Sequence, residues 1–231
     1  MRNFIIGDIH GCSGAFVMLL EKLDPDPGSD ILVLLGDLFD RGPDSWQVFQ
    51  TVKELKAVYG ERLILLLGNH EDYLLQPHLS WAQRRIWERV GRQATVRSFQ
   101  QHGEQMEDAA PWIREHAVMY YKTEGFQCVH AGIVIEPPEM NDVYTLLHDH
   151  EIVLENRYTG TLTVTGHIAL PVPAWFAGDG KTVKELAVEV WEPLPDHGVI
   201  CIDTGCGKGG ALTAMVVEGG RYCLTGVPGI M

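Results

Sequence analysis

The stretch FIIGDIHG, residues 4–11, ends a short apolar run with a glycine followed by acidic and imidazole side chains. The same arrangement recurs in LVLLGDLFDRG, residues 32–42, and in LILLLGNHE, residues 63–71. Successive glycines are separated by about thirty residues, the length of a strand–helix–strand unit. An unbroken apolar run is typical of a parallel strand that is buried on both faces. The three stretches therefore predict neighbouring parallel strands in an α/β fold.

The segments between and after these strands complete the predicted fold. Residues 15–23 and 46–58 place apolar side chains at three- and four-residue steps, which is typical of helices that pack on a sheet. A similar pattern predicts a helical insert over about 78–116, and one further helix is expected around 141–154. No segment has the composition of a linker, so we expect one domain over residues 1–231. The β-like runs of the second half are 118–123, 126–130, 161–165, 183–191, 199–203 and 211–217.

Composition argues against several classes of protein. Of the 231 residues, 45% are hydrophobic and 21% are charged, as is usual for a globular protein. The formal net charge of −13 argues against nucleic acid as a partner, because neutralising phosphates requires an excess of Lys and Arg. No apolar run approaches the roughly 18 residues that span a membrane, and no signal peptide is indicated. Five cysteines without a C-x-x-C pair suit a reducing compartment, so we expect a cytoplasmic protein with no membrane partner.

Polar side chains follow the three predicted strands and are expected to meet at one edge of the sheet. Ligands of parallel sheets bind beyond the carboxyl ends of the strands, and a glycine there permits a sharp turn. Imidazoles follow two later β-like runs, in CVHAG and TVTGH. This mixture of carboxylate, amide and imidazole groups suits Mn, Fe or Zn better than calcium. The polar residues that we expect at this edge of the sheet are Asp8, His10, Asp37, Asp40, Arg41, Asn69, His70, His130 and His167.

The motifs GDIHG, GDLFDRG and GNHE, followed by HAG and GH, resemble those of the calcineurin-like metallophosphoesterases. Within that superfamily the chain is similar to the short bacterial and phage members of the phosphoprotein phosphatase family, from Gly7 to about Ala214. The resemblance implies an α/β (α+β) fold, a β-sandwich of two mixed sheets flanked by helices. It also implies two divalent transition-metal ions, with Mn as the first choice and Fe or Zn as alternatives. Asp8, His10 and Asp37 would hold one ion, and Asp37, Asn69, His130 and His167 would hold the other.

The same resemblance implies a mechanism for phosphomonoester hydrolysis. Hydroxide held by the two metals would attack phosphorus in line. His70 would protonate the leaving oxygen, Asp40 would orient its imidazole, and Arg41 would bind phosphate oxygens. The family usually supplies a second arginine for phosphate in a W-x-R pattern, but the corresponding stretch here reads LLHDH, residues 146–150. We expect His150 or Arg157 to take its place in substrate binding.

Three functional hypotheses remain open. The first is a serine/threonine protein phosphatase, whose partner is a phosphorylated protein or a small phosphoester. The second is a symmetrical diadenosine tetraphosphate hydrolase, which shares the GD-H-G and GNH motifs. Asp40 argues against the second, because those enzymes tend to carry alanine there, whereas five arginines between residues 84 and 97 favour it. The third is a non-catalytic module that recognises phosphate, and the complete set of ligands with His70 and Arg41 argues against it.

Overall fold

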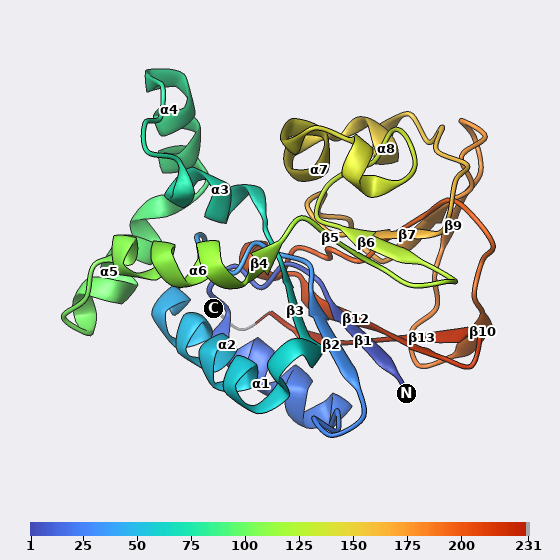
Figure 1. The fold of residues 1–231 in the computed structure, drawn as a ribbon, viewed down its shortest axis with the longest axis horizontal. Coiled ribbons are helices and arrows are strands. Elements are labelled where there is room, and N and C mark those ends of the chain that lie inside the picture. The colour runs from blue at the N-terminus through green and yellow to red at the C-terminus, as the bar shows by residue number, and fades with distance from the viewer. Residues whose placement is uncertain (230–231) are drawn as a thin grey trace.

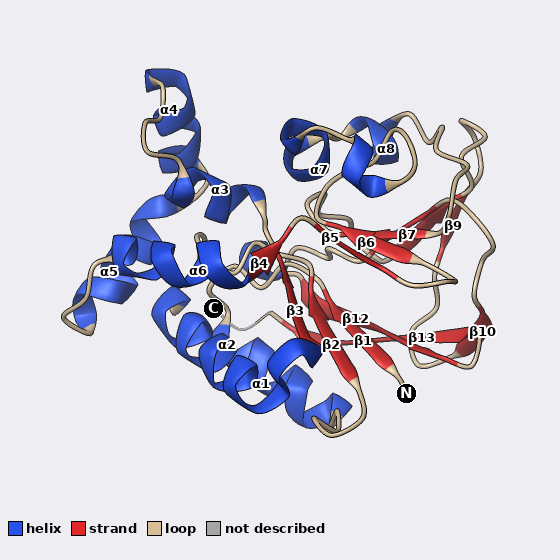
Figure 2. Cartoon of the chain, in the orientation of Figure 1, coloured by secondary structure: helices blue, strands red, loops and turns tan. Residues whose placement is uncertain are grey.

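Two mixed β-sheets pack face to face in the computed structural model, which describes residues 1–229 (Figure 1). Helices cover the outer faces of the sheets, as Figure 2 shows. The predicted sandwich of two mixed sheets flanked by helices is therefore confirmed. No helix within the described residues is long and apolar enough to cross a membrane.

The three apolar runs form the centre of the first sheet, as predicted. β1 (Asn3–Ile6), β2 (Ile31–Leu34) and β3 (Leu63–Leu66) pair in parallel, with Phe4 beside Leu32. The strand order of this sheet is β10-β13-β12-β1-β2-β3-β4. Its remaining strands are β4 (Ala117–Val118), β10 (Trp191–Pro193), β12 (Ala211–Glu218) and β13 (Arg221–Pro228).

Both faces of this sheet are buried, which explains why its central strands are apolar throughout. Side chains alternate between the two faces of a strand. Phe4 and Leu34 pack in one core cluster with Phe16 from the covering helices. Ile5 and Val33 belong to a second cluster, which lies between the two sheets. The covering helices are α1 (Ser13–Leu23) and α2 (Ser45–Tyr59).

The second sheet has the strand order β5-β6-β7-β11-β8-β9. β7 pairs in parallel with both β6 and β11, whereas the other pairs are antiparallel. Two short helices, α7 and α8, lie beside its outer face, where Ile152 and Val153 pack with Phe176 and Val199. These elements are β5 (Tyr120–Lys122), β6 (Gln127–Val129), β7 (Thr163–Thr165), β8 (Ala174–Phe176), β9 (Val183–Glu185), β11 (Val199–Cys201), α7 (Val143–His148) and α8 (Glu151–Leu154).

Some predicted elements of the second half are wrong in detail. The run 183–191 is split between β9 and β10, which belong to different sheets, and Glu189 turns the chain between them with a left-handed φ of 61°. The single helix expected around 141–154 is broken at Asp149, whose backbone is extended. β8 and β13 were not predicted, because β8 has only three residues and β13 contains Gly226, a residue type depleted in strands.

The segment from residue 78 to residue 116 is mainly helical, as predicted. It contains α4 (Trp81–Arg89), α5 (Arg92–Gln101) and α6 (Ala110–His116), and α3 (Asn69–Leu75) precedes it. Figure 1 shows α4 extending away from the sheets, while α7 lies across from it at the same end of the molecule. Short 3₁₀ turns are η1 (Gly60–Arg62), η2 (Met106–Ala109), η3 (Pro138–Met140) and η4 (Cys206–Lys208).

Strands of both sheets end close together at one edge of the sandwich. The turn after β2 depends on Gly36, whose φ of 98° is unfavourable for any residue with a Cβ atom. A Cβ at this position would lie 2.6 Å from the backbone nitrogen of Gly68, after β3, and 3.1 Å from Nδ1 of His130, after β6. The three strand ends therefore approach each other as closely as the backbone permits.

We expect Gly36→Ala to lower the free energy of unfolding by about 3 kcal/mol, because it combines a left-handed conformation with overlap against backbone atoms. Gly103→Ala is the control, since Gly103 also has a positive φ of 75° but a Cβ there would meet nothing within 4 Å. That variant should lose only about 1 kcal/mol. Urea unfolding measures both, and equal losses would contradict the close approach of the strand ends.

Candidate active site

The carboxylate of Asp37 lies at the centre of a buried cluster of imidazoles. Its Oδ2 is 3.4 Å from Nε2 of His10 and 3.7 Å from Nε2 of His70, and its Oδ1 is 3.4 Å from Nε2 of His130. Two sets of donor atoms share this carboxylate, with the atoms of each set within 4.8 Å of one another. The first set is His10, Asp37 and His70, and the second is Asp37, His130 and His167.

Asn69 and Asp8 complete the cluster from the ends of β3 and β1. Oδ1 of Asn69 lies 3.0 Å from Nε2 of His130 and 2.9 Å from Nδ1 of His167. Oδ2 of Asp8 is 3.8 Å from Nε2 of His10, and both carboxylate oxygens accept the backbone N–H of His167. The six residues predicted as metal ligands are thus brought together, although they come from five separate strand ends.

Three of these imidazoles are suited to bind metal because they are neutral. Nδ1 of His10 lies 2.7 Å from the carbonyl of Phe39, and Nδ1 of His130 lies 2.7 Å from the carbonyl of Leu35. Each ring therefore donates from Nδ1 and turns the lone pair of Nε2 towards Asp37. Burial lowers the pKa of both rings and lowers the pKa of His167 to about 2. A metal binds the neutral form of histidine.

The donor set fits divalent transition-metal ions. Nε2 of His167 is buried and has no hydrogen-bond partner within residues 1–229, which is unusual for a polar atom in a protein interior. Burial opposes a charge on Asp37, but the charge of the nearby His70 imidazole outweighs burial and lowers the pKa of this carboxyl. A charged carboxylate surrounded by neutral imidazoles is a typical ligand set for Mn, Fe or Zn.

His70 differs from the other imidazoles because it faces a second carboxylate. Its Nδ1 lies 2.6 Å from Oδ2 of Asp40, and both side chains are buried. Burial alone would lower the pKa of His70, but the charge of Asp37 and the hydrogen bond to Asp40 outweigh burial and raise it. His70 is therefore the imidazole of the cluster whose surroundings favour the protonated form, which a general acid requires.

Asp40 has two further partners that the sequence did not indicate. The indole N–H of Trp87 donates to Oδ2 of Asp40 at 2.7 Å, and the hydroxyl of Thr95 donates to Oδ1 at 2.6 Å. Trp87 lies on α4 and Thr95 on α5, more than forty residues from Asp40. No motif surrounds either residue, so their role could be found only from the fold.

Glu71 joins the loop after β2 to the loop after β3, and its role was also missed. One carboxylate oxygen accepts the backbone N–H groups of Leu38 and Phe39, and the other accepts those of Asp37 and Gly68. The loop needs this support because Asp37, and also residues 40 and 41, have positive φ angles of 50–69°. Each such residue with a Cβ costs about 1 kcal/mol or more.

A cavity of about 470 Å³ opens beside the imidazole cluster. Arg41 lies on its wall, and one of its guanidinium nitrogens is 2.6 Å from Nε2 of His10. The other residues that line the cavity are Asn69, His70, Tyr73, Gln83, Ile86, Val90, Tyr144, His148, His150, His167 and Lys208. The cavity thus combines the cluster, two cationic side chains and an apolar wall.

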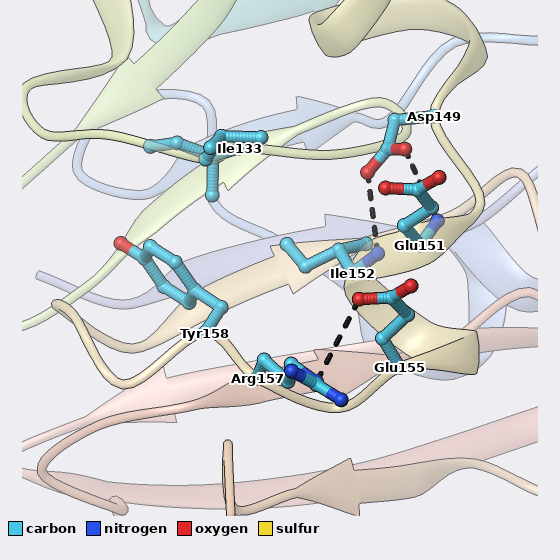
Figure 3. Close-up of a pocket in the computed structure, with 8 residues that line it drawn as sticks. Ile133, Asp149, Glu151, Ile152, Glu155, Arg157 and Tyr158 are labelled. Atoms are coloured by element: carbon cyan, nitrogen blue, oxygen red, sulfur yellow. Dashed lines mark hydrogen bonds and ion pairs between the residues drawn. The ribbon is translucent and has the colours of Figure 1, made fainter. Parts of the chain in front are cut away.

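The structure brings His150 to this cavity but not Arg157. The ring of His150 lies 4.6 Å from that of His167, centroid to centroid. Arg157 is instead 80% exposed and pairs with Glu155 in a separate hollow beside α8, which Figure 3 shows. The expectation that Arg157 reaches the cavity is not met, because it follows α8 and points along the edge of that helix.

Comparison with known proteins agrees with this geometry. A family model described as calcineurin-like phosphoesterase matches residues 1–208. The chain is 26% identical to a symmetrical bis(5'-nucleosyl)-tetraphosphatase of Pseudomonas putida, over 96% of this chain and 92% of that protein. A metallophosphoesterase from Sphaerobacter thermophilus has a similar fold, with a TM-score of 0.65, 14% identity and coverage of 98% and 88% of the two chains. A serine/threonine protein phosphatase from Saccharomyces cerevisiae also has a similar fold, with a TM-score of 0.58, 14% identity and coverage of 100% of this chain and 81% of that chain.

Replacement of Asp37 tests whether this carboxylate is shared by two metal ions. We expect Asp37→Asn to lower the affinity for Mn at both positions by at least about 100-fold, the upper end of the cost of losing even an outer-shell partner. Asp44→Asn is the control, since Asp44 lies in the next turn of the chain and is exposed. Metal content after equilibrium dialysis measures the effect, and loss of only one ion would contradict a shared ligand.

Replacement of Glu71 tests its role as a link between the two loops. In Glu71→Gln one acceptor oxygen becomes an NH₂ group that faces backbone N–H donors, so we expect the free energy of unfolding to fall by about 3 kcal/mol. The exposed Glu61 provides the control Glu61→Gln, which should change stability by less than about 0.5 kcal/mol. If urea unfolding finds the two variants alike, Glu71 does not hold the loops together.

Proposed function

The chain belongs to the calcineurin-like phosphoesterases, and we propose that it is a metal-dependent phosphomonoesterase acting on phosphoserine or phosphothreonine in proteins. Membership of this family makes the chain a phosphoester hydrolase that uses divalent metal ions. The substrate is the part that we propose, and it rests on how the site treats the leaving group. The contacts of His70 carry this proposal.

We propose the same two ligand groups that the sequence indicated. Asp8, His10 and Asp37 would hold one ion, with Mn as the first choice, and Asn69, His130 and His167 would complete the second position. When bound, such a pair of ions polarises phosphoryl oxygens and activates water near neutral pH. The neutral imidazoles and the charged Asp37 provide ligands that need not lose a proton first.

The remaining steps depend on side chains of the protein. Arg41 presents its guanidinium to the cavity, where it would bind phosphate oxygens and stabilise the charge that develops on them. His70 would donate the proton on Nε2 to the leaving oxygen. Its Nδ1–H would stay hydrogen-bonded to the carboxylate of Asp40. His150 lies on the same wall and would contact substrate in place of the family's second arginine.

The hydrogen bond between Asp40 and His70 is the observation that favours a phosphoserine or phosphothreonine substrate. Hydrolysis of an alkyl phosphate releases an alkoxide, a strongly basic leaving group that needs a proton in the transition state. Symmetrical cleavage of a dinucleoside tetraphosphate instead releases a nucleoside diphosphate, whose terminal phosphate is already a stable anion. A buried, oriented proton donor is therefore more useful for the alkyl ester than for a nucleoside polyphosphate.

A second candidate function is hydrolysis of dinucleoside tetraphosphates. Relatives of this chain include symmetrical bis(5'-nucleosyl)-tetraphosphatases, which match over 96% of its length. In addition, the ring of Tyr144 stacks on that of His148 with centroids 5.5 Å apart and an angle of 17° between planes. Tyr144 is 68% exposed at the cavity, opposite Ile86 of α4, so a nucleobase would find a planar surface there.

We also propose a cytoplasmic location and a single domain over residues 1–231 that includes the helical insert at 78–116. All five cysteines are free, which suits a reducing compartment. The insert packs on the rest of the structure through α5, whose Phe99 belongs to the core cluster that contains Phe16 and Leu34.

The test is hydrolysis by metal-stripped protein after Mn is restored, with a phosphoserine peptide and diadenosine tetraphosphate at equal concentrations. We expect the peptide to be the better substrate and His70→Asn to lower its rate about 100-fold or more. His102→Asn is the control, because His102 stacks on Trp46 away from the cluster. If only the tetraphosphate is hydrolysed, the second candidate replaces the first. If neither is hydrolysed although Mn is bound, both are wrong.

A further inference from the structure

Resting on the proposed function, we propose that Trp87 and Thr95 are positioning residues that orient Asp40 and, through it, direct His70 at the leaving oxygen. Both come from the helical insert, residues 78–116, which supplies none of the predicted metal ligands. This segment would then be part of the catalytic apparatus as well as a wall of the cavity.

The contacts around Asp40 account for every polar atom of its side chain. Oδ2 lies 2.6 Å from Nδ1 of His70 and 2.7 Å from Nε1 of Trp87. Oδ1 lies 2.6 Å from the hydroxyl of Thr95, which also accepts the backbone N–H of Asp40 at 2.8 Å. Asp40 is only 1% exposed, so no bulk water can replace these donors. Thr95 therefore anchors the backbone and one oxygen of Asp40, while Trp87 determines the direction of the other.

The backbone at Asp40 cannot hold this arrangement by itself. Asp40 and Arg41 have left-handed φ angles of 69° and 68°, a conformation that is unfavourable for residues with a Cβ atom. The turn between α4 and α5 lies against this loop at Gly91, which has a φ of 113°. A Cβ atom at Gly91 would lie only 2.5 Å from the backbone nitrogen of Arg41 and 2.8 Å from its Cα. The helical segment thus presses on the loop at the point where the loop is strained.

Trp87 and Thr95 are themselves held in place. The indole of Trp87 stacks on Tyr73 with centroids 5.8 Å apart, and the Arg92 guanidinium lies 4.9 Å from the ring. The hydroxyl of Thr95 lies 3.1 Å from that of Ser45 at the start of α2. Because the indole N–H of Trp87 and the hydroxyl of Thr95 have fixed directions, the packing of α4 and α5 on the sandwich determines the orientation of Asp40.

The inference predicts a loss that depends on the leaving group, which a general weakening of the fold would not produce. Phenyl phosphate and p-nitrophenyl phosphate have nearly the same size, but phenol is the more basic leaving group and depends more on a proton donor. In Mn-loaded protein, Trp87→Phe and Thr95→Val should each lower kcat for phenyl phosphate about tenfold or more. A factor of this size is expected when one hydrogen bond to a charged group is lost. KM and kcat for p-nitrophenyl phosphate should change less than about threefold.

Matched variants separate positioning from stability. Thr95→Ser retains the hydroxyl and should restore phenyl phosphate hydrolysis to within about threefold of wild type. Ser98→Ala removes a buried hydroxyl from the same helix, but that hydroxyl accepts from the backbone of Trp46 and not from Asp40. Trp81→Phe changes an exposed indole of α4. Both controls should leave the ratio of the two rates unchanged.

A measurement independent of turnover completes the test. In Zn-loaded protein the Nδ1–H proton of His70 should give an NMR signal protected from exchange with water, and this signal should be lost in Trp87→Phe and Thr95→Val but kept in Trp81→Phe. Equal losses for both esters, failure of Thr95→Ser to restore the ratio, or a His70 signal that survives both substitutions would overturn the inference. The proposed function fails separately, if wild type hydrolyses aryl phosphates but no phosphoserine peptide.

Discussion

The burial of one carboxylate, Asp37, among four imidazoles is the constraint on which the site depends. A charged carboxylate away from water must be surrounded by compensating groups, and here those groups come from the ends of strands in both sheets. Their convergence requires Gly36 and Gly68 to touch and Glu71 to bind four backbone N–H groups. The strand ends at this edge of the sandwich are therefore arranged around the negative charge of Asp37.

The metal-ligand candidates could be predicted from the sequence because each follows a strand within four residues. Asp8, Asp37 and Asn69 occupy equivalent places after three parallel strands, so the position of one implies that of the others. The partners of Asp40 are of a different kind. Trp87 and Thr95 approach it only because α4 and α5 pack back on the loop, and no local pattern encodes that contact.

The errors have similar causes. A β-like run predicts a strand over residues 183–191 but does not indicate which sheet each half joins, and the left-handed turn at Glu189 decides this. Arg157 is near His150 in the sequence, yet the short helix α8 separates them and places the guanidinium beside Glu155. In both cases one backbone turn outweighs proximity along the chain. The prediction of the fold class depended on long, regular apolar runs, and single turns of this kind do not affect it.

The helix α4 links two properties that enzymes usually vary separately. Ile86 lines the cavity, and Trp87, the next residue, binds Asp40. A shift of this helix that reshaped the cavity for a new substrate would also displace the indole N–H and weaken the proton donor. Evolution towards other substrates along this helix would therefore favour those with good leaving groups, since only these tolerate the accompanying loss of the acid. Selectivity and reactivity are epistatic in this fold because adjacent residues of one helix serve both.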